Sequence, residues 1–215
     1  MDTKANVVIG DFSRRGKARG GAAVKALDHD LAIKEKLAPV GILEVVSGRL
    51  DLRMGISYKT SDLLADSLEN WWEPRRCQLG HIKELVINLD NGSENSGRRT
   101  QFLARMVVFA EKTGLRIRLI YYPPYHSKYN PVERCRAALE KHWNGALLSD
   151  IRTALKRAGS MTWKGISPTV SLNKKIYKKA ARLFGKAKQA LEASLQRSPD
   201  LRWWDILINP SKSQG

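Results

Sequence analysis

The chain has 215 residues, of which 42% are hydrophobic, so it can form one sizeable core, or one domain with an appendage. No apolar run approaches the roughly 20 residues that cross a bilayer and no signal peptide is evident, so we expect a cytoplasmic protein. Thirty-eight Lys and Arg against 21 Asp and Glu give a net charge of +17, which predicts a nucleic-acid partner, with an anionic membrane surface as the less favoured alternative.

A basic loop follows the first predicted strand, which covers residues 5–12. Four Lys and Arg lie among glycines in this loop, and a flexible basic loop can follow a phosphate backbone. The four are Arg14, Arg15, Lys17 and Arg19. We expect them to bind the nucleic acid, and a solvated loop without a partner is the alternative.

The middle of the chain alternates strands with helices. Ser61 or Asp62 is predicted to cap one helix, and another helix is predicted to end at Gly114. Asn130 and Pro131 begin a third helix, since Asn caps helices and Pro fits the first helical turn. The predicted strands cover residues 40–46, 51–58, 84–90 and 115–122, and the predicted helices cover residues 61–72, 98–112 and 131–143.

Helices are predicted for the C-terminal part. One covers residues 150–157, and a long basic helix covers residues 173–196, where apolar side chains recur at helical spacing. A strand hairpin followed by alternating strands and helices describes a mixed sheet flanked by helices. The order fits an α/β protein with an RNase H-like mixed five-stranded sheet and extra C-terminal helices. Composition alone is compatible with other α/β folds.

Two carboxylates lie at the ends of predicted secondary-structure elements. Asp90 ends a short apolar strand, and Glu133 is the third residue of the helix that begins at Pro131. Each has an ordinary explanation, because Asp-Asn-Gly is a turn sequence and Glu133 can join Asn130 in capping the helix. Together at one edge of a sheet they can bind a divalent ion, and Mg²⁺ prefers oxygen ligands. With the basic charge, this favours a metal-dependent nucleic-acid enzyme.

The residues around these carboxylates resemble a known group of proteins. Asp90-Asn91-Gly92 and residues 123–133 (PPYHSKYNPVE) are similar to the second and third acidic motifs of DDE transposases, from mariner-like elements to bacterial insertion sequences. The closest resemblance is to the Rhodopirellula-type transposase family of bacterial insertion sequences. The other matching segments are residues 2–4 (DTK), 9–12 (IGDF), 127–128 (SK), 173–177 (NKKIY) and 201–208 (LRWWDILI).

The resemblance implies an RNase H-like catalytic domain in which Asp2, Asp90 and Glu133 bind two Mg²⁺, with Mn²⁺ as a substitute. It implies hydrolysis at the ends of an insertion sequence, followed by strand transfer into target DNA. The implied partners are the transposon ends and the target DNA, bound by a homodimer at the bacterial nucleoid. No small-molecule cofactor is implied.

The first carboxylate of this triad has two candidates. The family motif favours Asp2, whereas the local pattern alone prefers Asp11, which follows the apolar residues 7–9. Only Met1 precedes Asp2, so we expect a first strand that is cut short. We also expect the family's DNA-end-binding region, which precedes that strand, to be missing.

Residues near the carboxylates are expected to support them. His126 and Lys128 lie in the turn before the third carboxylate and are predicted to contact DNA. Asn91, Gly92 and Asn130 are predicted to shape the loop and the helix start rather than to bind metal.

The chain is expected to divide into a catalytic core at residues 1–145 and a C-terminal helical extension at residues 146–215. The predicted function is that of a DNA transposase catalytic domain. The alternative is a catalytically inactive, truncated transposase that only binds DNA. An unrelated RNA-associated basic protein is a third hypothesis, and it predicts a preference for RNA and no role for Asp90 or Glu133.

Overall fold

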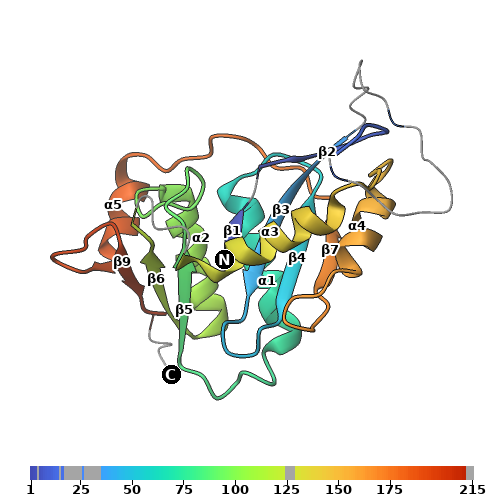
Figure 1. The fold of residues 1–215 in the computed structure, drawn as a ribbon. Helices are drawn as coiled ribbons and strands as arrows, with labels where there is room; N and C mark the ends of the chain where they lie inside the picture. Colours follow the sequence, from blue (N-terminus) through green and yellow to red (C-terminus); the bar gives the residue numbers. More distant parts are fainter. Residues whose placement is uncertain (4, 15, 17–25, 27–34, 124–128, 212–215) are drawn as a thin grey trace. The chain divides into compact units, whose positions relative to one another are not determined.

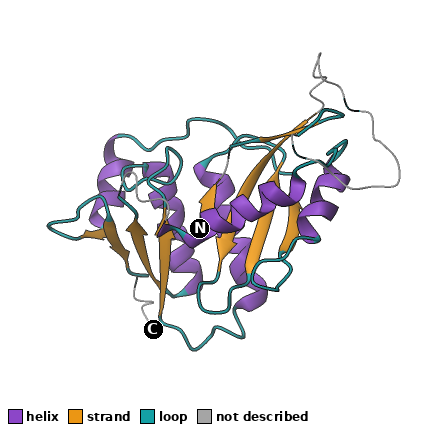
Figure 2. Ribbon diagram, in the orientation of Figure 1, coloured by secondary structure: helices purple, strands orange, loops and turns teal. Residues whose placement is uncertain are grey.

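The computed structural model describes residues 1–3, 5–14, 16, 26, 35–123 and 129–211, and these form two compact units. The unit that contains Asp90 consists of Met1, Lys59–Asn130 and Tyr177–Gly215; we call it the Asp90 unit. The unit that contains Glu133 consists of Asp2–Tyr58 and Pro131–Ile176; we call it the Glu133 unit. Each unit combines helices with strands (Figure 1, Figure 2) and is described by itself.

A mixed five-stranded sheet forms the centre of the Glu133 unit. Its strands are β1 (Asp2–Thr3), β2 (Val7–Ile9), β3 (Glu35–Leu43), β4 (Leu50–Gly55) and β7 (Thr169–Asn173). β3 pairs antiparallel with β1, β2 and β4, and β4 pairs parallel with β7. The turn between β3 and β4 needs the left-handed φ of +73° at Gly48, which glycine adopts without steric cost.

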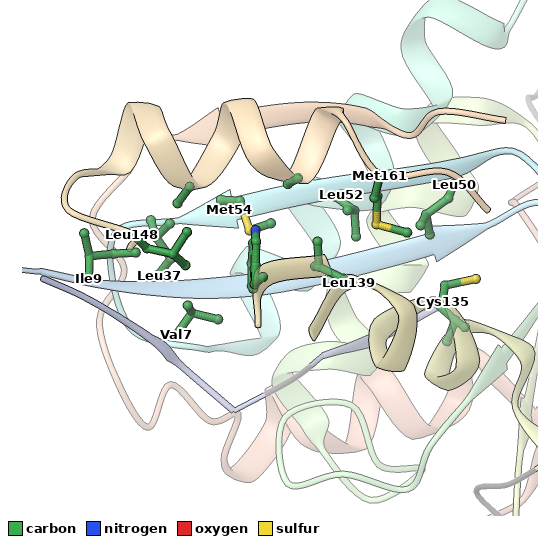
Figure 3. Packing of buried hydrophobic residues seen from close by; sticks show 14 residues of the cluster. Val7, Ile9, Leu37, Leu50, Leu52, Met54, Cys135, Leu139, Leu148 and Met161 are labelled. Carbon is green, nitrogen blue, oxygen red and sulfur yellow. The ribbon is translucent and has the colours of Figure 1, made fainter. Parts of the chain in front are cut away.

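Two helices, α3 (Pro131–Trp143) and α4 (Ile151–Gly159), cover one face of this sheet (Figure 1). The buried side chains of α3 recur every three or four residues, which places them on one helical face. Asp150 caps α4, since its Oδ1 accepts a 2.7 Å hydrogen bond from the backbone N–H of Thr153. The core between helices and sheet (Figure 3) contains Val7, Ile9, Leu37, Leu50, Leu52, Met54, Val132, Cys135, Leu139, Trp143, Leu148, Ala154, Ala158 and Met161.

The Asp90 unit has a second mixed sheet, with the strand order β5-β6-β9-β8. β5 (Glu84–Leu89) and β6 (Arg116–Tyr121) are parallel, and β9 (Asp205–Ile208) is antiparallel to both β6 and β8 (Leu195–Arg197). The helices of this unit are α1 (Ser61–Trp72), the 3-10 turn η1 (Glu73–Arg75), α2 (Thr100–Thr113) and α5 (Gly185–Ala193).

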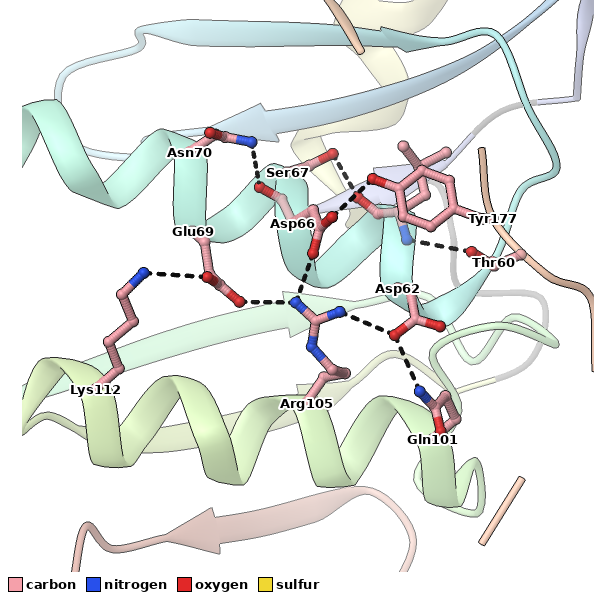
Figure 4. Close-up of polar contacts among 11 residues, drawn as sticks. Thr60, Asp62, Asp66, Ser67, Glu69, Asn70, Gln101, Arg105, Lys112 and Tyr177 are labelled. Atoms are coloured by element: carbon pink, nitrogen blue, oxygen red, sulfur yellow. Dashed lines mark hydrogen bonds and ion pairs between the residues drawn. The ribbon is translucent and has the colours of Figure 1, made fainter. Parts of the chain in front are cut away.

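An arginine joins α1 to α2. Arg105 on α2 reaches three carboxylates that lie along one side of α1, at 2.9 Å for Asp62, 2.5 Å for Asp66 and 2.8 Å for Glu69 (Figure 4). Burial lowers the pKa of Arg105, but the hydrogen bonds that it donates to these carboxylates outweigh this effect and raise the pKa above its ordinary value. The guanidinium therefore stays charged at the helix interface.

The predicted α/β class, with a mixed sheet flanked by helices, is confirmed and is consistent with an RNase H-like fold. The elements predicted between residues 40 and 157 are present, with ends displaced by a few residues. One cap differs: Thr60, rather than Ser61 or Asp62, caps α1, because Thr60 Oγ1 accepts a 3.2 Å hydrogen bond from Leu63 N.

The long helix predicted over residues 173–196 is wrong. The chain there forms the end of β7, a non-helical stretch at residues 174–184, then α5 and β8. Tyr177 anchors the stretch, since its buried hydroxyl donates a 2.8 Å hydrogen bond to Asp66 Oδ2, and Ala180 has a φ of +58° that no helix tolerates. The expected apolar stripe is only partly buried, since Leu191 and Leu195 are buried but Phe184 is 74% exposed.

Residues 146–215 contain strands as well as helices, since β7 joins the sheet of the Glu133 unit, and β8 and β9 join that of the Asp90 unit. The expected division into a catalytic core and an extension after residue 145 stays a prediction. Among the described residues, no helix has both the length and the apolar character that crossing a bilayer requires.

Candidate active site

Asp90 lies directly after β5, where the chain leaves the sheet. Its side chain is partly exposed, and Asn95 Nδ2 donates a 2.8 Å hydrogen bond to Asp90 Oδ1. Asn95 is buried, and its backbone N–H donates to the Gly92 carbonyl at 3.3 Å. A Cβ at Gly92 would lie 3.1 Å from Asn95 Oδ1 and 3.4 Å from Asp90 Oδ2, so glycine leaves room for both groups. The loop thus orients Asp90 through a hydrogen bond to one carboxylate oxygen, and Gly92 leaves space beside both oxygens.

The β8–β9 hairpin braces the loop after Asp90. Arg197 Nη1 donates a 3.0 Å hydrogen bond to the Gly97 carbonyl, and a Cβ at Gly97 would clash with the carbonyl of Trp203. Tyr121, the last residue of β6, is buried within the electric field of both Arg197 and Asp90. The pKa of its phenol is raised chiefly by burial, while Arg197 lowers it and Asp90 raises it further. The charges of Asp90 and of Arg197 on the hairpin therefore both act on the Tyr121 phenol.

Asp2 lies on β1 and is fully buried. It faces Gly41 across the β1–β3 ladder. A Cβ at Gly41 would lie only 3.0 Å from Cγ2 of Val132, the second residue of α3, and 3.9 Å from the Asp2 carbonyl. Glycine at this position therefore lets the first turn of α3, which carries Glu133, approach the strand beside Asp2.

Arg136 is the counter-ion of Asp2. Its Nη2 lies 2.5 Å from Asp2 Oδ2, and its side chain is 14% exposed. Arg136 follows Glu133 by one helical turn, so the two side chains lie on the same side of α3. Glu133 is partly exposed, and the described residues give it neither a hydrogen bond nor an ion pair. Of the two triad candidates in this unit, Asp2 therefore has a counter-ion, and Glu133 has none among the described residues.

The three carboxylates have the oxygen chemistry that Mg²⁺ and Mn²⁺ prefer. Within the part of the chain that the structure describes, no group of three or more His, Cys, Asp or Glu side chains is close enough to share an ion. Asp90 and Glu133 are partly exposed, so both are accessible from solvent. Asp2 fits as well, but an ion at its Oδ2 must take the place of Arg136, which already supplies positive charge there.

Of the predicted DNA contacts, Arg14 lies among the described residues. It donates a 3.1 Å hydrogen bond to the Val8 carbonyl, lies 3.8 Å from Glu140 and stacks 5.6 Å from the ring centre of Trp143. Its side chain is 14% exposed, so its observed partners are within the protein. Its contact with DNA stays a prediction. The other predicted contacts, Arg15, Lys17, Arg19, His126 and Lys128, lie outside the described residues.

The remaining candidates occupy different settings. Asp11 lies in a bend after β2 and is half-buried, whereas Asp2 is on a strand. Asn91 is exposed beside Asp90. Asn130 is buried immediately before α3, and its Nδ2 finds no hydrogen-bond partner among the described residues.

Three residues next to the carboxylates were not predicted from the sequence: Gly41, Asn95 and Arg136. A weak signal existed for Arg136, since a charge three residues after Glu133 shares its side of the helix. No local pattern pointed to Gly41 or Asn95. Gly41 matters because of Val132, which is distant in the sequence, and Asn95 reaches Asp90 only through the conformation of an irregular loop.

The chain matches a known protein family over nearly its whole length. The model of the Rhodopirellula transposase DDE domain matches residues 1–210, which include all of the described segments except residue 211. A search of curated proteins finds no match to this chain. The matched range contains Asp2, Asp90 and Glu133.

Proposed function

Since the chain belongs to the Rhodopirellula transposase DDE domain family, a family of polynucleotidyl transferases that act on DNA, we propose that it cleaves and joins strands at insertion-sequence ends. The match over residues 1–210 is the observation that carries this proposal. Water would attack a phosphodiester at the element end and release a 3′-hydroxyl. That hydroxyl would then attack a target phosphodiester and displace the target's 3′-oxygen. We further propose that the protein acts as a homodimer on DNA in the cytoplasm.

We assign the acidic triad to Asp2, Asp90 and Glu133, which would hold two Mg²⁺ or Mn²⁺ ions. When bound, the ions would stabilise negative charge on the attacking and leaving oxygens. Asp90 would present Oδ2 while Asn95 holds Oδ1. Glu133, without an ion pair among the described residues, would bind directly, and Asp2 would exchange Arg136 for an ion.

Isothermal calorimetry with Mn²⁺ tests this assignment without knowledge of the DNA ends. The wild-type protein is compared with Asp2→Asn, Asp90→Asn and Glu133→Gln, with Asp11→Asn as the matched control. We expect each triad variant to lose Mn²⁺ binding and the control to keep it. Loss in Asp11→Asn with binding kept in Asp2→Asn would move the first carboxylate to Asp11.

A second assay follows the reaction itself. Mn²⁺-dependent nicking of supercoiled DNA should occur with the wild-type protein and disappear with Asp90→Asn. Nicking that survives this substitution would mean that the proposed triad does not carry the activity.

The ion pair between Asp2 and Arg136 favours a second candidate function. If Arg136 keeps its place, the protein is a catalytically inactive transposase that only binds DNA. A folded wild-type protein that binds DNA but no Mn²⁺ would establish this alternative.

A further inference from the structure

Three arginines surround one tryptophan at the β8–β9 hairpin. The guanidinium carbons lie 5.0 Å (Arg98), 4.6 Å (Arg197) and 5.1 Å (Arg202) from the ring centre of Trp203. Each distance is within the range of a cation–π interaction. All three positive groups therefore lie within about 10 Å of one another around a single indole.

Among the residues that the structure describes, one of these arginines has its charge balanced by a carboxylate. Arg197 binds Glu192 through Nε and Nη2 at 2.9 and 3.0 Å. Arg98 and Arg202 are exposed, and among the described residues neither forms an ion pair with Asp or Glu. Two like charges are thus held together on a rigid aromatic surface, an arrangement that an anion between them would stabilise.

The cluster is joined to the loop that carries Asp90. Arg98 directly follows Gly97, whose carbonyl accepts the hydrogen bond from Arg197. The Cα of Gly97 packs closely against the backbone of Trp203. The buried Tyr121 phenol lies within the field of both Arg197 and Asp90. All of these residues belong to the Asp90 unit, so the cluster and Asp90 are held by one framework.

We propose that Arg98 and Arg202, positioned by Trp203, bind backbone phosphates of duplex DNA next to the segment that carries Asp90. Guanidinium groups bind phosphate oxygens through two parallel hydrogen bonds, and stacking on the indole fixes the direction of those donors. Such contacts position a duplex without reading its sequence. The choice of DNA as the polyanion rests on the proposed function. The anion-binding geometry rests instead on the positions of the three arginines around Trp203.

Fluorescence anisotropy with a labelled DNA duplex tests the proposal. The titrations are run in EDTA at several salt concentrations, so that metal binding and catalysis do not contribute. Each phosphate contact contributes about 0.9 to the slope of log K against log salt, so Arg98→Gln/Arg202→Gln should reduce that slope by about 1.8. Circular dichroism and thermal unfolding establish that the variant is folded.

The control is Arg75→Gln/Arg76→Gln, which removes the same charge from the same unit. Arg75 also stacks on a tryptophan, at 5.4 Å from the ring centre of Trp71, and Arg76 pairs with Glu73. We expect this control to keep the wild-type slope. An equal reduction in both variants would show a general effect of charge and would overturn the proposal, as would an unchanged slope in Arg98→Gln/Arg202→Gln.

A second variant separates geometry from charge. Arg98→Lys/Arg202→Lys keeps both charges but loses the planar fork, so we expect the salt slope to be kept and the affinity to fall. Wild-type affinity in this variant would contradict the stacked, bidentate geometry. Tighter binding of an RNA duplex than of DNA would overturn the choice of polyanion. Because the assay contains EDTA, loss of Mn²⁺ binding in the triad variants cannot produce any of these results.

Discussion

Asp2 and Arg136 form a buried ion pair, and the free energy of such a pair depends strongly on the presence of both partners. The charge of Asp2 is fully removed from water, while that of Arg136 is nearly so. Desolvating two charges offsets much of their attraction, so the pair itself contributes little to stability. Removal of one partner leaves the other charge buried without compensation.

Arg136→Met should therefore lower the free energy of unfolding by about 3 kcal/mol, because the buried Asp2 would lose its ion pair with Arg136. Urea unfolding followed by circular dichroism measures the change. The double variant Asp2→Asn/Arg136→Met serves as the control and should recover much of the loss. If Arg136→Met is as stable as the wild-type protein, the ion pair is not formed in solution.

Asn95 provides a second test at this scale. Asn95→Ala removes the hydrogen bond to Asp90 Oδ1, and loss of an outer-shell partner of a metal ligand typically weakens metal binding by about 10- to 100-fold. Calorimetry with Mn²⁺ measures this change. Ser93→Ala is the matched control, since Ser93 lies in the same loop but is exposed and donates to Glu94 rather than to Asp90, and the affinity of this variant should stay near that of the wild-type protein.

Sequence patterns identified Asp90 and Glu133 as candidates because each stands at a local boundary, a strand end and a helix start. The partners of these residues could not be predicted in the same way. Asn95 acts through a loop conformation, and Gly41 matters only because Val132 packs against it. Such roles come from tertiary contacts, which no short pattern encodes.

At the scale of elements, the contact between α1 and α2 depends on one arginine. Asp62, Asp66 and Glu69 lie on the same side of α1, and their mutual repulsion is relieved by Arg105 (Figure 4). The side chains are 14–23% exposed, so the cluster is neither a surface pair nor a fully buried one.

Arg105→Leu should lower the free energy of unfolding by about 2–4 kcal/mol, because three carboxylates would remain together at a partly buried interface. Thermal or urea unfolding measures the loss. Lys112→Gln is the control: Lys112 contacts Glu69 at 3.3 Å but is 56% exposed, so its removal should cost less than about 1 kcal/mol. Equal effects of the two substitutions would contradict a special role for Arg105.

Elements were predictable where hydrophobic periodicity and caps agree, as in α2 with its stop at Gly114 and α3 with its start at Pro131. The helix expected over residues 173–196 shows the limit of that approach. Its apolar residues recur at helical spacing, but Tyr177 finds its partner on α1, and that contact holds the chain in a non-helical path. The partner that decides the conformation here, Asp66, is more than 100 residues away in the sequence.

At the scale of the molecule, each sheet is completed by residues beyond position 145. β7 pairs with β4 in one unit, and β9 pairs with β6 in the other. A chain that ends at residue 145 would leave β4 and β6 with exposed hydrogen-bonding edges and open apolar faces.

We expect residues 1–145 alone to lack a cooperative unfolding transition and to aggregate, even though they contain all three proposed carboxylates. Size-exclusion chromatography and thermal unfolding test this, with the full chain as reference. Co-expression with residues 146–215 should restore a soluble complex. A stable, cooperatively folded fragment of residues 1–145 would establish that boundary as a true domain limit.

The division of the chain between the two units has a consequence for how such a gene decays. Met1, residues 59–130 and residues 177–215 belong to one unit, and the segments between them belong to the other. A frameshift or stop codon between residues 145 and 169 therefore removes β7 from one unit and β8 and β9 from the other. Such a truncation should be as disabling as the loss of an acidic motif, because neither sheet would be complete.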